Sequence, residues 1–580
     1  MNKPVQIKQL FRSLKEKGFN ESAFFIIIIT FACSLPLFNN FILNRGDVHF
    51  HLQRIQNIKV NLLEGNFPVR MNYLAGGVDM RLPKPWCGNI GVPRPIMYPE
   101  LFLYIPAILC ILGVPLVFSA NAFSILINLS CALISYFSVK QITKSKNIGL
   151  IFSGIYTLSI YRLDGIFQRY TLGEAQAIVF IPLVMLGIYE ILYNDDKKWL
   201  LLVIGITGVL QSHIISFFIS ACFLVLFFFF SIKHLTKLRI LSLGKSIVTT
   251  LGLNAWFIIP FFCYYKIVDL PDMILFGGVP ETGVSFNQMF LTFVDNYLTI
   301  GGVVGIGLVL FIYGIWVNKG EDIGETKEIK SIGKVSLLFG FIAAFFASKF
   351  FPWSVLKPLL YIFQNIQFAW RFFIIATPLL ALSASIGFYI FFKRFNIHEK
   401  LAVFIAVFIC IVGNAYFIDN ALKPAFNLRW IDEVWNNCIE SDYKYKDSDW
   451  NYSQEKYNTV VKSSDDIVLE KFKKQNDKIA LSFINNSNAD DSYIEVPLYA
   501  FPGYVAFLNG KKIPVENGTN NFIRLYLPYG VKNGTIKVSY RESKIFIIGN
   551  VITILTIIVL CGVRVYKTRK YKNASHIRLL

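Results

Sequence analysis

The chain has 580 residues, of which 54% are hydrophobic, 16% aromatic and only 16% charged. A soluble protein of this length carries more charge and shorter apolar runs, so the composition excludes a soluble enzyme. In a soluble protein the net charge of +20 would suggest nucleic acid as a partner. Here much of the excess positive charge flanks apolar runs, which indicates membrane topology and lipid contact, and we expect no nucleic-acid partner.

The first apolar run, SAFFIIIITFACSLPLFNNFIL over residues 22–43, is long enough to cross the hydrocarbon core of a bilayer. It is too long for a cleavable signal peptide, and no small-residue cleavage site follows it. The preceding residues 1–21 are basic, which places them in the cytoplasm. The run then leads outward into a long loop over residues 44–96.

Two more apolar runs follow at 97–118 and 120–140, but Lys140, Lys144 and Lys146 after them look cytoplasmic. The two runs therefore make one net crossing, and segment 97–118 either spans the bilayer fully or is re-entrant. We expect further spans at about 147–161, 175–193, 199–212, 213–232, 246–264, 298–317, 334–350, 371–392 and 400–418. The basic clusters between these spans fall on the inside, in agreement with the topology.

Residues 421–543 differ from the rest of the chain, because they are polar and rich in Asn, Lys, Asp and Tyr. Stretches such as YVAFLNGKKIPV and NFIRLYLPYG alternate between apolar and polar residues, and the alternating stretches of this region are separated by Asn-Gly pairs, which are typical of hairpin turns. We expect a small extracellular β-sandwich-like domain here. A last span at 544–566 then leads into a basic cytoplasmic tail, 567–580. The predicted fold class is a polytopic α-helical membrane protein with about 12–13 transmembrane helices and a β-domain before the last of them.

The outer loop opens with GDVHFHLQR, directly after the first span. Asp47, His51 and Arg54 have the spacing i, i+4, i+7, so a helix places them on one face, with His49 off that face. One interpretation is that Asp47 only caps a helix at the membrane surface, since aspartate is a favoured N-cap. The other is that these residues form part of a polar site.

Three later polar groups also fall at the outer ends of spans. They are Arg162, Asp164, Arg169 and Glu174 in YRLDGIFQRYTLGEAQ, Gln211 and His213 in GVLQSHIIS, and Gln367, Trp370 and Arg371 in FQNIQFAWRFF. As alternatives, the arginines only reach lipid headgroups, Trp370 and Arg371 anchor the interface, and His213 is an ordinary loop histidine. Glu174 fits such readings less well, because an unpaired carboxylate at the start of an apolar span is costly. Four polar groups on one side predict an outward-facing site.

Carboxylates, arginines and a histidine beside apolar helices suit the transfer of a sugar from a lipid-phosphate donor. A carboxylate base takes the proton of the acceptor hydroxyl while this hydroxyl attacks the anomeric carbon. The departing phosphate gains negative charge and needs Arg, Lys, His or a metal ion nearby. Because the lipid chain of the donor stays in the bilayer, the reaction takes place at the membrane interface.

Five stretches, taken in order, resemble the GT-C superfamily of polytopic glycosyltransferases: GDVHFHLQRIQNIKVNLLEGNFPVR, YRLDGIFQRYTLGEAQAIVFIPLVMLG, LQSHIIS, NAWFIIPFF and IQFAWRFF. More narrowly, the chain is similar to the bacterial YfhO-like membrane proteins, also labelled 6-pyruvoyl-tetrahydropterin synthase-related. The likeness covers residues 22–420, and the YVAFLNGKKIPV region looks like the terminal β-domain of that group. The pterin label has no support in these residues, because scattered histidines do not supply a zinc-binding cluster.

The resemblance implies an inverting enzyme that uses polyprenyl-phosphate sugars and has a catalytic aspartate in the first outer loop, where this chain has Asp47. A second acidic residue in a later outer loop matches Glu174. Histidines stand where some relatives have a second acid, so a divalent metal (Mg or Mn) held by Asp47 and Glu174 stays an open alternative. In its absence, His49 or His51 would stabilise the phosphate directly. No other cofactor is expected.

The resulting hypothesis is an outward-facing glycosyltransferase of the cell membrane, which moves a sugar onto extracellular polysaccharide, a teichoic-acid-like polymer or a glycolipid. Its residues are Asp47 as base, Glu174 as second acid, and His49, His51, Arg54, Arg162, Asp164, Arg169, His213, Gln367, Trp370 and Arg371 at the donor phosphate or substrate. The β-domain binds or orients the acceptor polymer. One alternative is a lipid-linked sugar transporter or flippase, although the spans are nearly free of charge except near their ends. Another is a non-catalytic assembly factor for cell-envelope polysaccharide.

Overall fold

The structure is a computed structural model that describes residues 20–39, 42–43, 46–73, 90–269, 278–290, 298–317, 325–356, 363–422, 427–428, 443–456, 459–486 and 491–577. Most of the predicted N-terminal segment, residues 74–89 of the predicted outer loop and most of 421–442 lie outside the described residues. The chain divides into two compact units. The first unit comprises 1–51, 114–246 and 272–429, and the second comprises 52–113, 247–271 and 430–580.

The first unit is helical. Its longer helices are α2 (Glu21–Ser34), α6 (Leu116–Thr143), α7 (Lys146–Thr157), α8 (Ile160–Phe167), α9 (Leu172–Tyr193), α10 (Leu200–Leu210), α11 (Ile214–Phe230), α16 (Gly302–Val317), α17 (Glu325–Phe346), α19 (Phe373–Arg394), α20 (Glu399–Gly413) and α21 (Ala415–Leu422). Short elements are η1 (Leu35–Phe38), α14 (Gly278–Glu281), α15 (Phe286–Phe290), η5 (Gln364–Ile366), η6 (Ala369–Phe372) and the paired strands β1 (Ile42–Leu43) and β2 (Asn427–Leu428). Two helices, α3 (Val48–Leu63) and α12 (Lys237–Leu253), run across the boundary between the units.

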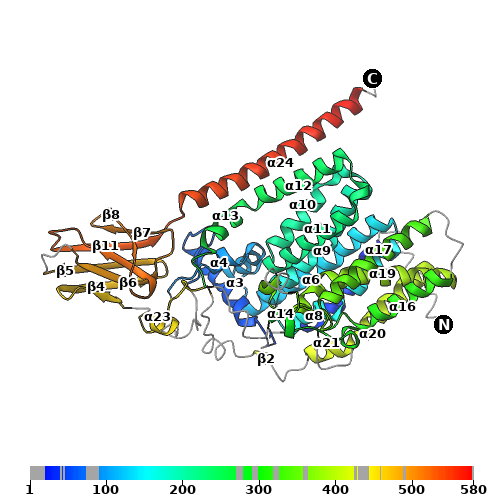
Figure 1. The fold of residues 1–580 in the computed structure, drawn as a ribbon, viewed down its shortest axis with the longest axis horizontal. Coiled ribbons are helices and arrows are strands. Elements are labelled where there is room, and N and C mark those ends of the chain that lie inside the picture. Colours follow the sequence, from blue (N-terminus) through cyan, green and yellow to red (C-terminus); the bar gives the residue numbers. More distant parts are fainter. Residues whose placement is uncertain are drawn as a thin grey trace. The chain divides into compact units, whose positions relative to one another are not determined.

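Helices α9 and α19 are the most enclosed of the long helices, with 83% and 89% of their apolar windows buried. Both are apolar on all sides, as expected for helices surrounded by other helices. Small residues allow close packing, because a Cβ added at Gly387 of α19 would lie 2.2 Å from the carbonyl oxygen of Gly307 on α16. Figure 1 shows α16, α17 and α19 in green. This helical packing fixes the ends of α9 and α19, where the polar residues gather.

Among the described residues, six helices are long and apolar enough to cross a membrane, or up to eight if two bent helix pairs each count as one span. The six are Glu21–Phe38, Leu116–Thr143, Leu172–Tyr193, Lys327–Phe346, Ala369–Arg394 and Lys544–Val565, and the bent pairs are α12 with α13 (Ala255–Tyr264) and α20 with α21. The chain is thus a multi-pass membrane protein. Fewer helices pass this test than the 12–13 predicted, because several predicted spans form shorter apolar helices, such as Leu101–Ile111, Ile214–Phe230 and Gly302–Val317. Within 97–118 the apolar helix covers only Leu101–Ile111, which is shorter than a full span.

In the second unit, helices and a β-domain come from distant parts of the chain. Besides α13, its helices are α4 (Arg94–Met97), η2 (Leu101–Leu103), α5 (Tyr104–Ile111), α23 (Trp450–Lys456), η9 (Thr519–Asn521) and α24 (Lys544–Ile577). Arg70 links several of these segments, since it donates to the Trp256 carbonyl oxygen at 2.9 Å, to Glu542 at 2.6 Å and to the Asn550 side chain at 3.1 Å. The apolar helix α24 therefore packs beside α13.

The predicted β-domain is present directly before α24, as Figure 1 shows in orange. A four-stranded sheet has the order β3-β6-β10-β9 and a five-stranded sheet the order β4-β5-β11-β7-β8. The strands are β3 (Lys462–Ser463), β4 (Ile467–Gln475), β5 (Lys478–Asn485), β6 (Tyr493–Tyr499), β7 (Tyr504–Leu508), β8 (Lys511–Ile513), β9 (Glu516–Asn517), β10 (Phe522–Tyr526) and β11 (Asn533–Tyr540). Alternate residues such as Leu481, Val496 and Val538 are buried, as in a sandwich of two sheets. The predicted fold class is confirmed in these features.

Candidate active site

The site begins at a tight turn between α8 and α9 in the first unit. The Asp164 carbonyl oxygen accepts the backbone N–H of Arg169 at 2.9 Å, and the Thr171 N–H donates to the Gly165 carbonyl at 2.8 Å. Tyr170 adopts a left-handed backbone conformation with φ of 49°, which reverses the chain. The turn thereby brings Arg169 beside Asp164 and beside the first turn of α9.

Glu174 lies in that first turn, and its side chain is only 2% exposed. The Tyr161 hydroxyl donates to Oε1 of Glu174 at 2.5 Å, and Nη2 of Arg169 lies 3.3 Å from the same oxygen. Nε of Arg371 lies 3.8 Å from Oε2. A carboxylate withdrawn from water needs such partners, and the helix N-terminus also favours negative charge. Glu174 is therefore the centre of a buried ionic cluster formed with Tyr161, Asp164, Arg169 and Arg371.

Arg169 connects the two carboxylates of this cluster. Its Nε donates to Asp164, while its Nη atoms face Glu174. Burial raises the pKa of the Asp164 carboxyl above its ordinary value, although Arg169 opposes this shift. Burial disfavours the charged form of Arg169 itself, but Glu174 and Asp164 outweigh it, so the pKa of Arg169 is raised. The guanidinium is thus a fixed positive charge between two acids.

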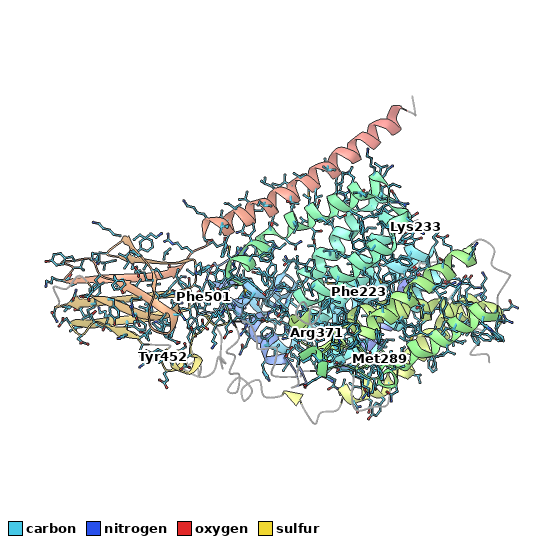
Figure 2. The ribbon with its side chains drawn as sticks, in the orientation of Figure 1. Phe223, Lys233, Met289, Arg371, Tyr452 and Phe501 are labelled. Carbon is cyan, nitrogen blue, oxygen red and sulfur yellow. The ribbon has the colours of Figure 1, made fainter. Side chains whose placement is uncertain are left out.

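An aromatic pair separates the two guanidiniums of the cluster. Arg169 lies over the Trp370 ring at 4.4 Å, Trp370 stacks on Phe368 with centroids 4.9 Å apart, and Arg371 lies over Phe368 at 5.2 Å. Gln367 just before them has a left-handed φ of 72° and is partly exposed. Cations over aromatic faces are held by the ring quadrupole. Trp370 and Phe368 therefore keep both arginines directed at Glu174; Figure 2 labels Arg371 at this position.

His213 approaches the cluster from the N-terminus of α11. It is buried, and its Nδ1 is 2.7 Å from the Ser216 hydroxyl and accepts the Ser216 N–H at 3.3 Å, so the ring caps the helix. It also acts electrostatically on Glu174. Capping explains why a histidine directly precedes α11. Because it also acts on Glu174, we count His213 among the residues of the candidate site.

Asp47 lies against the same turn through the backbone. Its N–H donates to the Arg169 carbonyl oxygen at 2.8 Å, and a Cβ added at Gly46, where φ is 53°, would lie 2.0 Å from that oxygen. The Asp47 side chain is exposed, and its carbonyl oxygen accepts the N–H of His51 at 3.0 Å at the start of α3. His51 is buried, with its ring 6.3 Å from that of Tyr170. Glycine at position 46 is thus needed for the approach of Asp47 to the cluster.

His49 lies beside these residues in the first turn of α3 and is partly buried. Burial lowers the pKa of its imidazole to about 4. At neutral pH the ring is therefore uncharged. In that form it can donate a hydrogen bond to a phosphate.

Arg162 points away from the cluster, although it belongs to the same helix as Asp164. Its guanidinium donates to the Thr157 carbonyl oxygen at 2.8 Å and to the Asn128 side chain, and the residue is fully buried. Asn128 in turn donates to the Ser34 hydroxyl at 2.9 Å. These contacts join α8 to α6 and α2, so they give Arg162 a role in packing.

Arg54 belongs to the second unit and has a carboxylate partner that the sequence reading did not identify. Its Nε donates to Glu100 at 2.9 Å and its Nη2 to the Pro99 carbonyl oxygen at 2.5 Å, while the guanidinium lies 4.1 Å from the Tyr98 ring centroid. Both charged side chains are almost fully buried. Burial raises the pKa of Glu100, and Arg54 and then Arg94 oppose this shift.

Sequence reasoning also missed Tyr161 and Phe368, which complete the cluster in the first unit. Tyr161 stands three residues before Asp164, so helical periodicity places both on one face of α8, whereas Arg162 is turned away from it. That spacing was available in the sequence. Phe368 has no such signal, because its role depends on the left-handed turn at Gln367.

The residues around Glu174 do not fit a divalent metal ion. Among the described residues, no group of three or more His, Cys, Asp or Glu side chains is placed to hold one. A guanidinium lies beside each oxygen of the Glu174 carboxylate, Arg169 at Oε1 and Arg371 at Oε2. A metal ion bound there would instead need further oxygen ligands. We therefore derive no step of the reaction through a metal.

An apolar cavity of 340 Å³ lies between α9, α11, α17 and α19. On α19 its lining begins at Ile375, one turn after Arg371, and on α9 it extends from Ile181 to Tyr193. This distance along α9 is about 18 Å at a rise of 1.5 Å per residue. Phe223, labelled in Figure 2, lines the cavity from α11. The cavity thus extends away from the end of the helices where the ionic cluster lies.

Comparisons with known proteins give little further information. No family model matches the chain, and no curated protein is significantly similar to it in sequence. Among solved structures it is similar to the cryo-EM structure of the arabinofuranosyltransferase AftD from Mycobacteria, with a TM-score of 0.39 and 11% sequence identity over 69% of this chain. The match spans 27% of that chain, about a quarter of its length. This likeness is too distant to assign a fold family or an activity, so the function is argued from the residues.

Proposed function

We propose that the protein is an outward-facing membrane glycosyltransferase of the GT-C type, which moves a sugar from a polyprenyl-phosphate donor to an extracellular polymer or glycolipid. The observation that carries the proposal is the buried ionic cluster in which Glu174 holds Arg169 and Arg371 at one end of membrane-spanning helices. Such charge is expensive within an apolar helical unit, which favours a role in binding or catalysis over one in packing.

The donor has two parts that the first unit accommodates separately. A phosphate is bound most strongly by guanidiniums, which offer several N–H donors and a permanent charge. Arg169 and Arg371 are held for this purpose by Glu174 and by the Trp370–Phe368 pair. The hydrocarbon chain would enter the apolar cavity, whose lining begins one turn from Arg371. Head group and chain would thus bind to adjoining surfaces.

In the proposed reaction Asp47 takes the proton of the acceptor hydroxyl. The hydroxyl oxygen forms a bond to the anomeric carbon, the bond from that carbon to the phosphate oxygen breaks, and polyprenyl phosphate leaves with the bonding electrons. Arg169 and Arg371 stabilise the charge that develops on the phosphate. Asp47 suits the role of base because its carboxyl group is exposed and its backbone is attached to Arg169.

Glu174 has a different role in this proposal. Its two oxygens face Tyr161, Arg169 and Arg371, so it orients the phosphate-binding groups and does not act as the base. In this proposal His213, which acts electrostatically on Glu174, and Gln367, which directly precedes Phe368, contact the sugar or phosphate. Arg54 would act only indirectly, because Glu100 and the Pro99 carbonyl oxygen already bind its guanidinium.

A transporter is the main alternative, because two helix pairs are bent, by 70° at α12–α13 and by 47° at α20–α21. Broken helices are common in transporters, where ionisable residues or exposed backbone at the break bind the cargo. Here the breaks contain Asn254 and Asn414, whose side chains donate to carbonyl oxygens of their own helices at 2.7 Å. These asparagines satisfy the backbone locally, which favours the enzyme.

The test is a transfer assay in membranes that contain wild-type protein or the Asp47→Asn variant at matched expression. Polyprenyl-phosphate donors with a radiolabelled sugar are supplied, and label in extracted polymer is measured. We expect wild type to transfer label from one donor and Asp47→Asn to lose at least about a hundredfold in rate, as for loss of a general base. Asp465→Asn, an exposed change of the same type, should have no effect. Equal transfer by wild type and Asp47→Asn would exclude Asp47 as the base.

A further inference from the structure

The five-stranded sheet of the β-domain has a row of lysines on its outer face. Lys473 on β4 pairs with Ala480, Ala480 with Lys537 on β11, Lys537 with Phe507, and Phe507 with Lys512 on β8. Residues directly opposite one another in paired strands point to the same face. The row therefore crosses all five strands, and its three lysines stand about 10 Å apart, which is twice the spacing of neighbouring strands.

This outer face carries much more positive than negative charge. Lys473, Lys512, Lys537 and also Lys471, two residues from Lys473 on the same face, are exposed. The other outward positions hold Val468, Gln475, Lys478, Ala480, Ser482, Ile484, Val505, Phe507, Asn533, Thr535 and Ser539. Among the described residues of these five strands the one acidic residue is Glu470, which falls at the bulge between Leu469 and Lys471. We call this surface the lysine face.

Charged residues are arranged differently on the four-stranded sheet of the same domain. Lys462 on β3 pairs with Glu495, Glu495 with Arg524, and Arg524 with Glu516, so positive and negative residues alternate along the row. Arg524 and Glu495 form an ion pair at 2.6 Å. The domain therefore pairs opposite charges on one sheet and leaves an excess of positive charge on the other.

Protection of sheet edges explains only part of the lysine face. Lysines on edge strands prevent pairing with other chains, and β4 and β8 are the two edges of this sheet. Lys537, however, lies on β11, the central strand, where no edge needs protection. Like charges across a sheet also reduce stability. A central lysine in line with the edge lysines thus indicates a ligand with a matching row of negative charges.

We propose that the lysine face binds a linear anionic polymer, whose phosphate or carboxylate groups contact Lys473, Lys537 and Lys512. Phe507 and Val505 between the lysines provide apolar contact for the polymer backbone, and Arg541 lies 5.1 Å from the Phe507 ring centroid as an additional cation. The proposal rests on the proposed function where it identifies this polymer as the sugar acceptor. A flat, regularly charged row suits an extended polymer chain better than a compact ligand.

The test uses full-length protein in nanodiscs of neutral lipid. Binding of fluorescent polygalacturonate and of linear polyphosphate is measured for wild type, for Lys473→Gln/Lys512→Gln/Lys537→Gln and for a control, Lys446→Gln/Lys456→Gln/Lys462→Gln. Both triple variants lose the same net charge. We expect the first to raise the Kd roughly tenfold and the control to stay within about twofold, as for exposed charge pairs. Added salt should weaken wild-type binding, because it screens exposed charges.

Several outcomes would overturn the proposal. These are equal losses in both triple variants, equal binding of neutral dextran, no binding of either polyanion by wild type, and displacement of the polymer by phosphatidylglycerol vesicles, which would make the face a membrane contact. Sugar transfer to a short neutral acceptor separates this proposal from the proposed function. The lysine-face variant should keep that activity, whereas Glu174→Gln should lose it and still bind polymer.

Discussion

Charged residues are arranged in opposite ways around Glu174 and on the lysine face. Around Glu174 every charge has a partner within hydrogen-bond or ion-pair distance, and the aromatic rings of Trp370 and Phe368 shield the guanidiniums. On the lysine face, like charges stand in a row in water. Burial explains the difference, because a charge without water needs a partner, whereas an exposed lysine does not.

Mutations in these two regions should therefore have different effects. Removing a charge from the buried cluster leaves its partner unpaired and should affect both folding and activity. Removing a lysine from the exposed face should affect only the binding of a partner, since surface changes usually alter stability little. The predictions below test this contrast from the largest expected effect to the smallest.

The largest effect is expected for Glu174→Gln. The neutral side chain no longer balances Arg169 and Arg371, so both guanidiniums lose their orientation toward the donor phosphate. We expect sugar transfer to fall at least about a hundredfold, the loss typical of a misplaced charge-stabilising group. Glu399→Gln is the matched control, because Glu399 also lies in the first turn of a helix, α20, but is exposed. Equal rates in the two variants would show that the cluster is only structural.

A buried charge in the β-domain should behave like the cluster and unlike the lysine face. Glu495 is fully buried and accepts from Arg524 at 2.7 Å and from the Thr519 N–H at 3.0 Å. Glu495→Gln should lower the free energy of unfolding by about 2 kcal/mol, the usual value for charge-assisted hydrogen bonds. Lys537→Gln should change it by less than about 0.5 kcal/mol. Denaturant unfolding of the full-length protein measures both, and a larger effect for Lys537→Gln would contradict the contrast.

Trp370→Leu should disturb the cluster without removing a charge. The leucine side chain keeps the site apolar but removes the ring between Arg169 and Phe368. We expect transfer to fall about tenfold, which corresponds to the 1–2 kcal/mol of a shielded cation–π contact. The effect should appear in the KM for the lipid donor, because Arg169 would bind the phosphate less well. Trp316→Leu on α16, where the ring is 70% exposed, serves as the control and should leave KM unchanged.

The smallest effect concerns pH. The pKa of His49 is lowered to about 4 in the folded protein, from an ordinary value of 6.5, because of burial. Between these values the unfolded chain binds the proton and the folded protein does not, so stability increases with pH from 4 to 6.5 and is complete above that range. In His49→Gln the melting temperature should depend less on pH between 4 and 6.5. His398→Gln, a change at an exposed position, should leave this dependence as in wild type. An unchanged pH profile in His49→Gln would show that another group controls it.

The β-domain could be predicted because its signals are local. In YVAFLNGKKIPV, the predicted hairpin forms between β7 and β8, with Leu508 opposite Lys511. Asn509 and Gly510 between them have φ of 49° and 83°, as expected for a type I′ turn. Apolar alternation fixes which residues enter the core, so two sheets follow without long-range information.

The candidate site could be predicted only in part. The residues Asp164, Arg169 and Glu174 lie within one turn of the chain, and their grouping was visible in the sequence. Arg371 is almost two hundred positions from Glu174 in the sequence. The two side chains meet only because α9 and α19 pack together. Arg162 was grouped with them because it is close in sequence, but it faces Asn128 on α6. Sequence proximity was thus less informative than the helical periodicity of α8.

The most direct test of the central claim is the release of polyprenyl phosphate by purified protein in nanodiscs. The protein is supplied with one polyprenyl-phosphate sugar and a soluble hydroxyl acceptor, and the lipid product is measured for wild type, Glu174→Gln and Glu399→Gln. We expect release by wild type and Glu399→Gln, dependent on the acceptor, and almost none by Glu174→Gln. Intact donor in every sample, together with its movement across the membrane of wild-type vesicles, would contradict the account and indicate a transporter.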